Sequence, residues 1–224
     1  MLSAAVGIAV ILLALITYSV RAQDKVSKPN LKKFSTGQIL SCFDDWKVCE
    51  KGDWDIADEL LKRNVVHELL DLYWKEPRFM VRNGIEKVAY QVNSGEVTVF
   101  MRRIVVEKVD DGEDDYFPVN YMAKKCYPQA LGELSTGKYR NQGSMQYESS
   151  VELLGKCKYR PAIPYLVGTA LHDFSFNIIE GADHSLHKLY PDSPKDFDDL
   201  ATMQRYYCDR AHKEGFKVKC DYDY

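Results

Sequence analysis

The segment Glu96–Val109 reads EVTVFMRRIVVEKV and decides the fold class that the sequence predicts. Much of it is valine or isoleucine, and β-branched side chains favour extended strands. The next stretch, Asp110–Asp115, contains the Asp-Gly dipeptide that is typical of two-residue hairpin turns. Tyr116–Tyr127 would then form the returning strand. The sequence therefore predicts a small antiparallel sheet in the middle of the chain.

Helical patterns lie on both sides of the predicted sheet. Apolar residues recur at helical spacing in four segments. These are Ser35–Glu50, Asp53–Trp74, Pro164–Phe174 and Asp196–Gly215. Ser35 or Thr36 suits the N-cap of the first helix, and Gly215 suits the C-cap of the last one. Helices before and after a sheet indicate an α+β fold, with N-terminal helices, a small antiparallel sheet and C-terminal helices.

Other segments carry weaker signals. Arg78–Val92 and Ser144–Lys158 fit either a helix or a strand, while Gly181–Pro194 reads as a polar loop that contains histidines. The absence of a second linker favours one domain over residues 35–224, and residues 23–34 read as a polar, basic linker.

The composition is that of a globular protein. The 224 residues are 46% hydrophobic and 28% charged, which excludes collagen, a coiled coil and a disordered tail. The formal net charge of −3 argues against general nucleic-acid binding, because that function needs an excess of basic residues. No nucleic-acid partner is therefore expected.

Residues 1–22 are predicted to be a signal peptide or a transmembrane anchor. Leu2–Val20 is free of charge, and a helix of that length extends about 28 Å, enough to cross a bilayer. Small side chains at Val20 and Ala22 suit a cleavage site before Gln23. Cleavage would send the domain into the secretory pathway as an extracellular protein, whereas an uncleaved segment could anchor the domain on the outer side of a membrane.

The residues around this segment also allow the opposite orientation. No lysine or arginine precedes the apolar run, whereas the following flank is basic. Its basic residues are Arg21, Lys25, Lys28, Lys32 and Lys33. The positive-inside rule would place that flank, and the domain after it, in the cytosol or an organelle matrix. Residues 2–20 would then remain in the membrane as an uncleaved anchor. The sequence does not decide between the two compartments.

The six cysteines all follow the apolar segment. They are Cys42, Cys49, Cys126, Cys157, Cys208 and Cys220. An even number suits three disulfides, although a core of this size is also compatible with free thiols. Cys42 and Cys49 would lie about 10.5 Å apart on one unbroken helix, too far for a mutual bridge. Pairing of Cys208 with Cys220 would hold the C-terminus against the last helix.

Histidines supply a weak metal-site candidate. His184 and His187 are three residues apart, so one ion could contact both on a helix. The dipeptide His172-Asp173 is of a kind used by helical metal phosphohydrolases, and further ligands would have to come from elsewhere. No catalytic residue is assigned and no cofactor is expected, because no nucleophile motif is readable.

Tyrosine is concentrated in the second half of the chain, where 12 of the 15 tyrosines lie. Two tyrosines stand directly before arginine, in Tyr139-Arg140 and Tyr159-Arg160. Tyrosine and arginine are enriched at recognition surfaces, so these four residues are the candidate partner-binding residues. The alternative is that the rings belong to the core.

Three functions fit these observations. The first is a secreted or membrane-tethered, disulfide-stabilised binding domain that is not an enzyme and engages a protein or a small ligand. The second is a single-pass accessory subunit of a larger membrane complex. The third is a metal-dependent hydrolase that uses the region from His172 to His187. A protein partner is expected in the first two.

Overall fold

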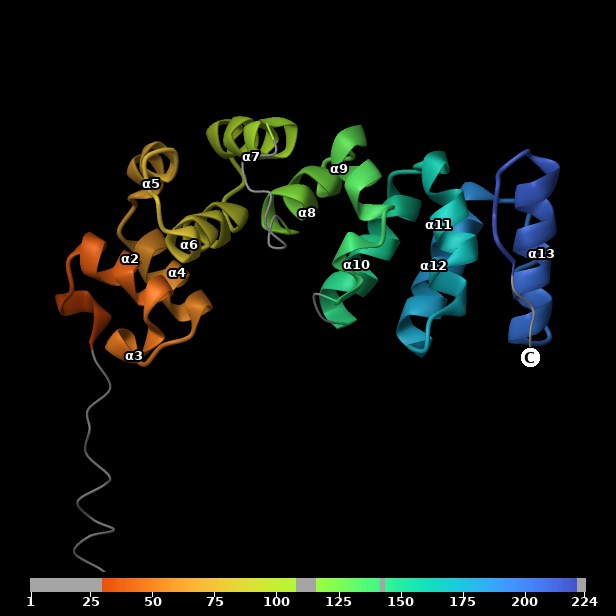
Figure 1. The fold of residues 1–224 in the computed structure, drawn as a ribbon, viewed down its shortest axis with the longest axis horizontal. Helices are drawn as coiled ribbons and strands as arrows, with labels where there is room; N and C mark the ends of the chain where they lie inside the picture. Colours follow the sequence, from red (N-terminus) through yellow and green to blue (C-terminus); the bar gives the residue numbers. More distant parts are fainter. Residues whose placement is uncertain (1–29, 108–115, 142–143, 221–224) are drawn as a thin grey trace, which may run out of the picture. The chain divides into compact units, whose positions relative to one another are not determined.

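The computed structural model describes residues 30–107, 116–141 and 144–220 (Figure 1). Every regular element in those ranges is a helix, and no strand occurs there. The predicted α+β fold with an antiparallel sheet is therefore wrong. The two expected strands are the helices α7 (Gly95–Glu107) and α8 (Tyr116–Lys124). The expected hairpin loop and the apolar segment of residues 1–22 lie outside the described residues.

The burial of side chains in α7 follows the spacing of a helix and not that of a strand. Val97 and Val99 would share one face of a strand, yet Val97 is fully buried and Val99 is 70% exposed. The buried residues instead follow helical spacing, as Val97, Phe100, Met101, Ile104 and Val105. The Ser94 hydroxyl accepts a hydrogen bond from the Val97 amide at 3.1 Å, which satisfies one amide of the first turn.

The described residues divide into two compact units, one on each side of the boundary between residues 64 and 65. The helices of the first unit are η1 (Leu31–Lys33), α2 (Thr36–Asp44), α3 (Trp46–Cys49) and α4 (Asp53–Lys62). Arg63 donates hydrogen bonds to the carbonyls of Leu31 and Phe34, so the last residues of the expected linker pack beside α4.

The predicted helix over Ser35–Glu50 is interrupted at Asp45. Its start is confirmed, because Ser35 and Gln38 form a reciprocal capping box. Asp45 has an extended backbone, and this break brings the Cα atoms of Cys42 and Cys49 to 5.7 Å. The two cysteines form a disulfide, so the expectation that they could not pair is wrong. It assumed an unbroken helix.

The second unit continues the all-helical pattern. Its α-helices before the last four are α5 (Val66–Tyr73), α6 (Phe79–Tyr90), α7, α8 and α9 (Pro128–Leu134). The last four are α10 (Ser144–Lys156), α11 (Ile163–Gly168), α12 (Phe176–Leu189) and α13 (Leu200–Lys213). Short 3₁₀ turns cover Lys138–Asn141, Arg160–Ala162 and Ala170–His172. The predicted polar loop over Gly181–Pro194 is thus mostly the C-terminal half of α12.

The same turn ends α8, α10 and α13. Cys126, Lys158 and Gly215 each have a positive φ, between 52° and 84°. The next residue donates its amide hydrogen to the carbonyl five residues earlier, as Tyr127 does to Met122. This Schellman geometry satisfies helix-end carbonyls and reverses the chain. The prediction that Gly215 ends the last helix is confirmed.

Two further disulfides lie in the second unit. Cys126–Cys157 joins the turn after α8 to the end of α10, with 5.3 Å between the Cα atoms. Cys208–Cys220 joins α13 to the segment that follows it. The expected bond between Cys208 and the C-terminal segment is therefore present. Among the helices that the structure describes, none is both long and apolar enough to span a bilayer.

Helix α12 packs closely against α10 at a glycine (Figure 1). A Cβ atom built on Gly155 would lie 2.4 Å from the Cα of Ser185. The Ser185 hydroxyl donates to the Val151 carbonyl at 2.9 Å, so the polar atom at this contact is satisfied. Only a residue without a side chain allows this approach.

We predict that Gly155→Ala lowers the free energy of unfolding by about 2–4 kcal/mol, because the backbone of α12 must move away. Urea unfolding followed by circular dichroism measures the change. The control is Gly95→Ala, where a Cβ would meet nothing within 4 Å and the effect should stay below about 1 kcal/mol. Equal effects of the two substitutions would contradict the close packing.

Candidate functional site

The candidate site is a groove between α12, the loop over residues 190–199 and the start of α13. Its volume is about 940 Å³, near the upper end of the range for ligand pockets, about 300–1,000 Å³. Glu152 of α10 also contributes to the lining, so four segments of the second unit surround it.

The apolar part of the groove is exposed to solvent. Phe176 is 74% exposed and Leu200 is 40% exposed, although both carry large apolar side chains. Ile179, Phe197 and Met203 continue this apolar lining. Exposed apolar surface of this kind is typical of places where another molecule binds.

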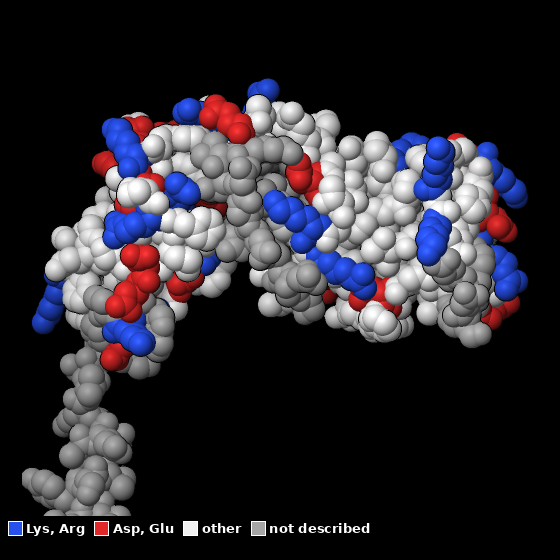
Figure 2. All heavy atoms as spheres, viewed as in Figure 1, with Lys and Arg blue, Asp and Glu red and all other residues white. Residues whose placement is uncertain are grey.

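Charged side chains surround the apolar lining. The acidic ones are Glu152, Glu180, Asp183, Asp196 and Asp199, and the basic ones are Lys188 and Lys195. The lining therefore carries more negative than positive charge. Figure 2 shows both acidic and basic side chains on the face that it draws.

The loop of the groove is held by His187. Its Nε2 lies 2.7 Å from the Pro194 carbonyl oxygen, and its Nδ1 lies 3.0 Å from the Asp183 carbonyl oxygen. A carbonyl oxygen only accepts hydrogen bonds, so full satisfaction requires a hydrogen on both nitrogens. A hydrogen on Nε2 ties the loop to α12, and protonation of Nδ1 adds the second bond, to the Asp183 carbonyl within α12.

Tyr207 of α13 completes this network. Its hydroxyl lies 3.0 Å from the Asp183 carboxylate and 2.9 Å from His187 Nδ1. Tyr207 is fully buried, and burial is the largest influence raising the pKa of its hydroxyl, which stays protonated. Asp183, His187 and Tyr207 therefore connect α12, the loop and α13.

The pKa of His187 is raised above its usual value of 6.5. Burial alone lowers this pKa, but hydrogen bonds to the carbonyls of Asp183 and Pro194 and the charge of Asp183 outweigh it. His187 is thus charged over a wider pH range than an exposed histidine.

Further contacts fix the loop at both ends. Arg210 binds both carboxylate oxygens of Asp192, at 2.8 and 3.2 Å. The Ser193 hydroxyl donates to the Tyr190 carbonyl, which tightens the first turn. Asp199 accepts the Thr202 amide at 2.7 Å and caps α13. The groove therefore has a defined wall before any ligand binds.

The two histidines of the metal hypothesis differ in their surroundings. His184 lines the groove and is exposed. Both ring nitrogens of His187, in contrast, lie within hydrogen-bond distance of backbone carbonyl oxygens. A metal ion would have to displace the Pro194 or Asp183 carbonyl from His187. His172 ends a 3₁₀ turn and is not part of the groove lining.

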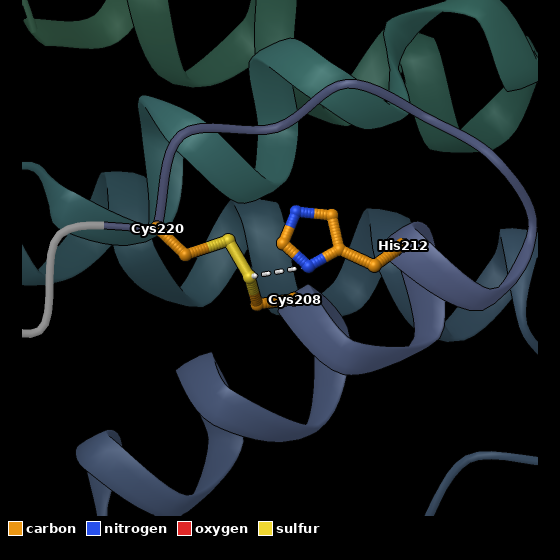
Figure 3. Close-up of side chains that lie close together, drawn as sticks. All are labelled: Cys208, His212 and Cys220. Carbon is orange, nitrogen blue, oxygen red and sulfur yellow. Dashed lines mark hydrogen bonds between the residues drawn. A yellow bond between two sulfur atoms is a disulfide. The ribbon is translucent and has the colours of Figure 1, made fainter.

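A second group of potential ligand atoms lies at the C-terminal end of α13 (Figure 3). Cys208 Sγ, His212 Nδ1 and Cys220 Sγ lie within 4.8 Å of one another. The two sulfur atoms are joined in a disulfide, and a disulfide offers no thiolate to a metal. His212 Nε2 lies 3.0 Å from the Val218 carbonyl oxygen and holds the C-terminal segment.

The four predicted partner-binding residues are spread over the second unit. Tyr139 is 1% exposed and packs edge-to-face on Tyr116, as a core residue does. Arg140 pairs with Asp173 at 3.0 Å. Tyr159 is half-buried, and Arg160 pairs with Glu214 and lies over the Tyr190 ring. None of the four lines the groove.

Sequence reasoning missed the residues that form the groove. Phe176 carries no signal in the sequence, because an apolar residue does not reveal its exposure there. Leu200 and Tyr207 show only the apolar spacing of the last predicted helix, Asp196–Gly215. The histidines were the one signal near the site, since both candidate ligands line the groove.

We predict that His187 makes the stability of the protein depend on pH. A folded-state pKa above 6.5 gives a stabilisation that is full below about 6.5 and is lost as the pH rises through the raised value. His187→Gln should therefore lower the free energy of unfolding more at pH 5.5 than at pH 8.5, as measured by urea unfolding.

The control for this prediction is His184→Gln. His184 is exposed, so the substitution should leave the pH dependence unchanged. A pH dependence that is the same in the wild type and in His187→Gln would show that protonation of His187 does not stabilise the fold.

Comparison with known proteins adds no match: no protein family, no curated protein and no solved structure corresponds to this chain. No residue role is therefore carried over from another protein. The description of the groove comes from its own side chains and their contacts.

Proposed function

We propose that this chain is a non-enzymatic, disulfide-stabilised binding protein of an oxidising compartment. It is secreted or tethered to the outer side of a membrane, and it binds a segment of a partner protein in the groove between α12 and α13. The observation that carries the proposal is the exposed apolar lining at Phe176 and Leu200, in a groove whose wall is already fixed.

The fixed wall favours binding. A loop that is ordered before the ligand arrives loses little conformational entropy on association. The contacts of His187 with Pro194 and of Arg210 with Asp192 supply this order. Aromatic and aliphatic side chains that are exposed in the free protein can then be buried by the partner.

The geometry gives less support to the hydrolase alternative. A general base needs a nitrogen that faces the substrate and can accept a proton. Both ring nitrogens of His187 already face carbonyl oxygens of the protein. His184 is exposed, and it makes no hydrogen bond to a side chain that would orient it as a base, among the residues that the structure describes.

The cysteines support the choice of compartment. All six pair within the chain, as Cys42–Cys49, Cys126–Cys157 and Cys208–Cys220. Disulfides persist in secreted and extracellular proteins and are rare in reducing compartments. Three disulfides therefore favour the secretory route over an anchored domain in the cytosol or an organelle matrix.

Mass spectrometry of the protein from its native source tests the compartment. We expect a mature chain that resists alkylation until it is reduced, after which six cysteines become modified. A chain that retains Met1 and carries six alkylatable thiols without reduction would contradict the secreted form.

Selection from a random peptide library tests the binding function. We expect the purified full chain to select peptides whose affinity falls at least tenfold, about 1.4 kcal/mol, in Phe176→Ala and Leu200→Ala. Fluorescence anisotropy with the labelled peptides measures the affinity.

The matched control is Val99→Ala, which removes an equally exposed apolar side chain from α7, outside the groove. The Val99→Ala variant should bind the selected peptides with the same affinity as the wild type. If selection yields no peptide, or only peptides that are insensitive to Phe176→Ala, the groove is not the binding site.

A further inference from the structure

The geometry points to a specific ligand chemistry, and this inference rests on the proposed function. We propose that the groove binds a peptide segment in which one or two lysines or arginines stand beside an aromatic or aliphatic anchor residue. Three features of the groove support this chemistry: its exposure to solvent, its apolar lining and its excess of acidic side chains.

The exposure of the lining favours a segment of a protein chain. A pocket for a small molecule encloses its ligand, burying about 70–90% of the ligand surface. Here Phe176, Leu200 and Lys195 are exposed on the rim, so a ligand would remain open to solvent on one side. An anchor side chain can enter such a groove while the peptide backbone stays at its mouth.

The apolar lining selects the anchor. Phe176 and Ile179 lie on α12, and they face the same groove as Leu200 and Met203 of α13. An aromatic or branched aliphatic side chain placed between them removes apolar surface of both partners from water. A polar side chain in this position would gain no such contact.

The carboxylates select the flanking charge. Among the five acidic residues of the lining, Asp183 is bound to His187 and Tyr207, and Asp199 caps α13. Glu152, Glu180 and Asp196 have no ion pair among the described residues. They come from α10, α12 and the loop, so three of the segments that line the groove each offer a carboxylate to a cation of the ligand.

The two lysines limit how basic the ligand can be. Lys188 and Lys195 line the same groove, and a third or fourth cation on the ligand would face them. Like charges that face each other across an interface lower the affinity, so these lysines disfavour a ligand with many basic residues. This arrangement favours an apolar anchor with few basic neighbours over a polybasic segment.

Parallel selections from one random peptide library test the inference. The wild type should enrich lysine or arginine within two positions of an aromatic or aliphatic residue. The double variant Glu180→Gln, Asp196→Asn should lose that basic enrichment, while its selected peptides still depend on Phe176. The basic peptides selected by the wild type should bind this double variant at least tenfold more weakly than they bind the wild type.

A control variant carries the same change of charge elsewhere. Glu68→Gln with Asp209→Asn neutralises two exposed carboxylates outside the groove and should enrich the same basic peptides as the wild type. Raising the salt concentration should weaken the basic peptides more than neutral ones, because exposed charges are screened.

The outcomes separate this inference from the proposed function. Peptides that depend on Phe176 but show no basic enrichment, or show acidic enrichment, overturn the ligand chemistry and leave the binding groove standing. Binding of a small apolar cation in place of any peptide also overturns it. A selection without Phe176-dependent peptides overturns both.

Discussion

The close contact between α10 and α12 is the constraint on which the rest of the second unit depends. Gly155 leaves room for the backbone at Ser185, so the two helices approach more closely than side chains would allow. This contact fixes the position of α12, and α12 supplies one wall of the groove together with Asp183 and His187. The groove is therefore a consequence of helix packing, and the loop of residues 190–199 closes onto a wall that already exists.

Local signals in the sequence predicted parts of the fold correctly. The Ser35 cap, the helix through α13 and the end at Gly215 depend on nearby residues, so they can be predicted without the tertiary structure. The predicted sheet failed because β-branched residues in Glu96–Val109 were weighed above their spacing. Val97 buried beside an exposed Val99 is a helical pattern, and tertiary packing of the apolar face decides such segments.

The candidate site was less predictable, because its parts meet only in the folded chain. His187 and Asp183 are four residues apart on α12, a spacing that a sequence shows, but the Pro194 carbonyl and the Tyr207 hydroxyl reach them from the loop and from α13. The four predicted partner-binding residues do not line the groove, and their role stays a prediction. Tyrosine serves both cores and interfaces, and the buried Tyr139 shows that composition alone does not separate them.

The Cys126–Cys157 bond has a consequence for how the protein would survive damage to its backbone. The bond joins the end of α8 to the end of α10, and everything between them lies within one covalent ring. A protease that cuts one peptide bond inside this ring opens it without releasing a fragment. The helices on either side stay attached through sulfur, so a nicked molecule remains one covalent piece. In the secretory setting proposed above, such a link would keep a nicked chain together after cleavage by a protease.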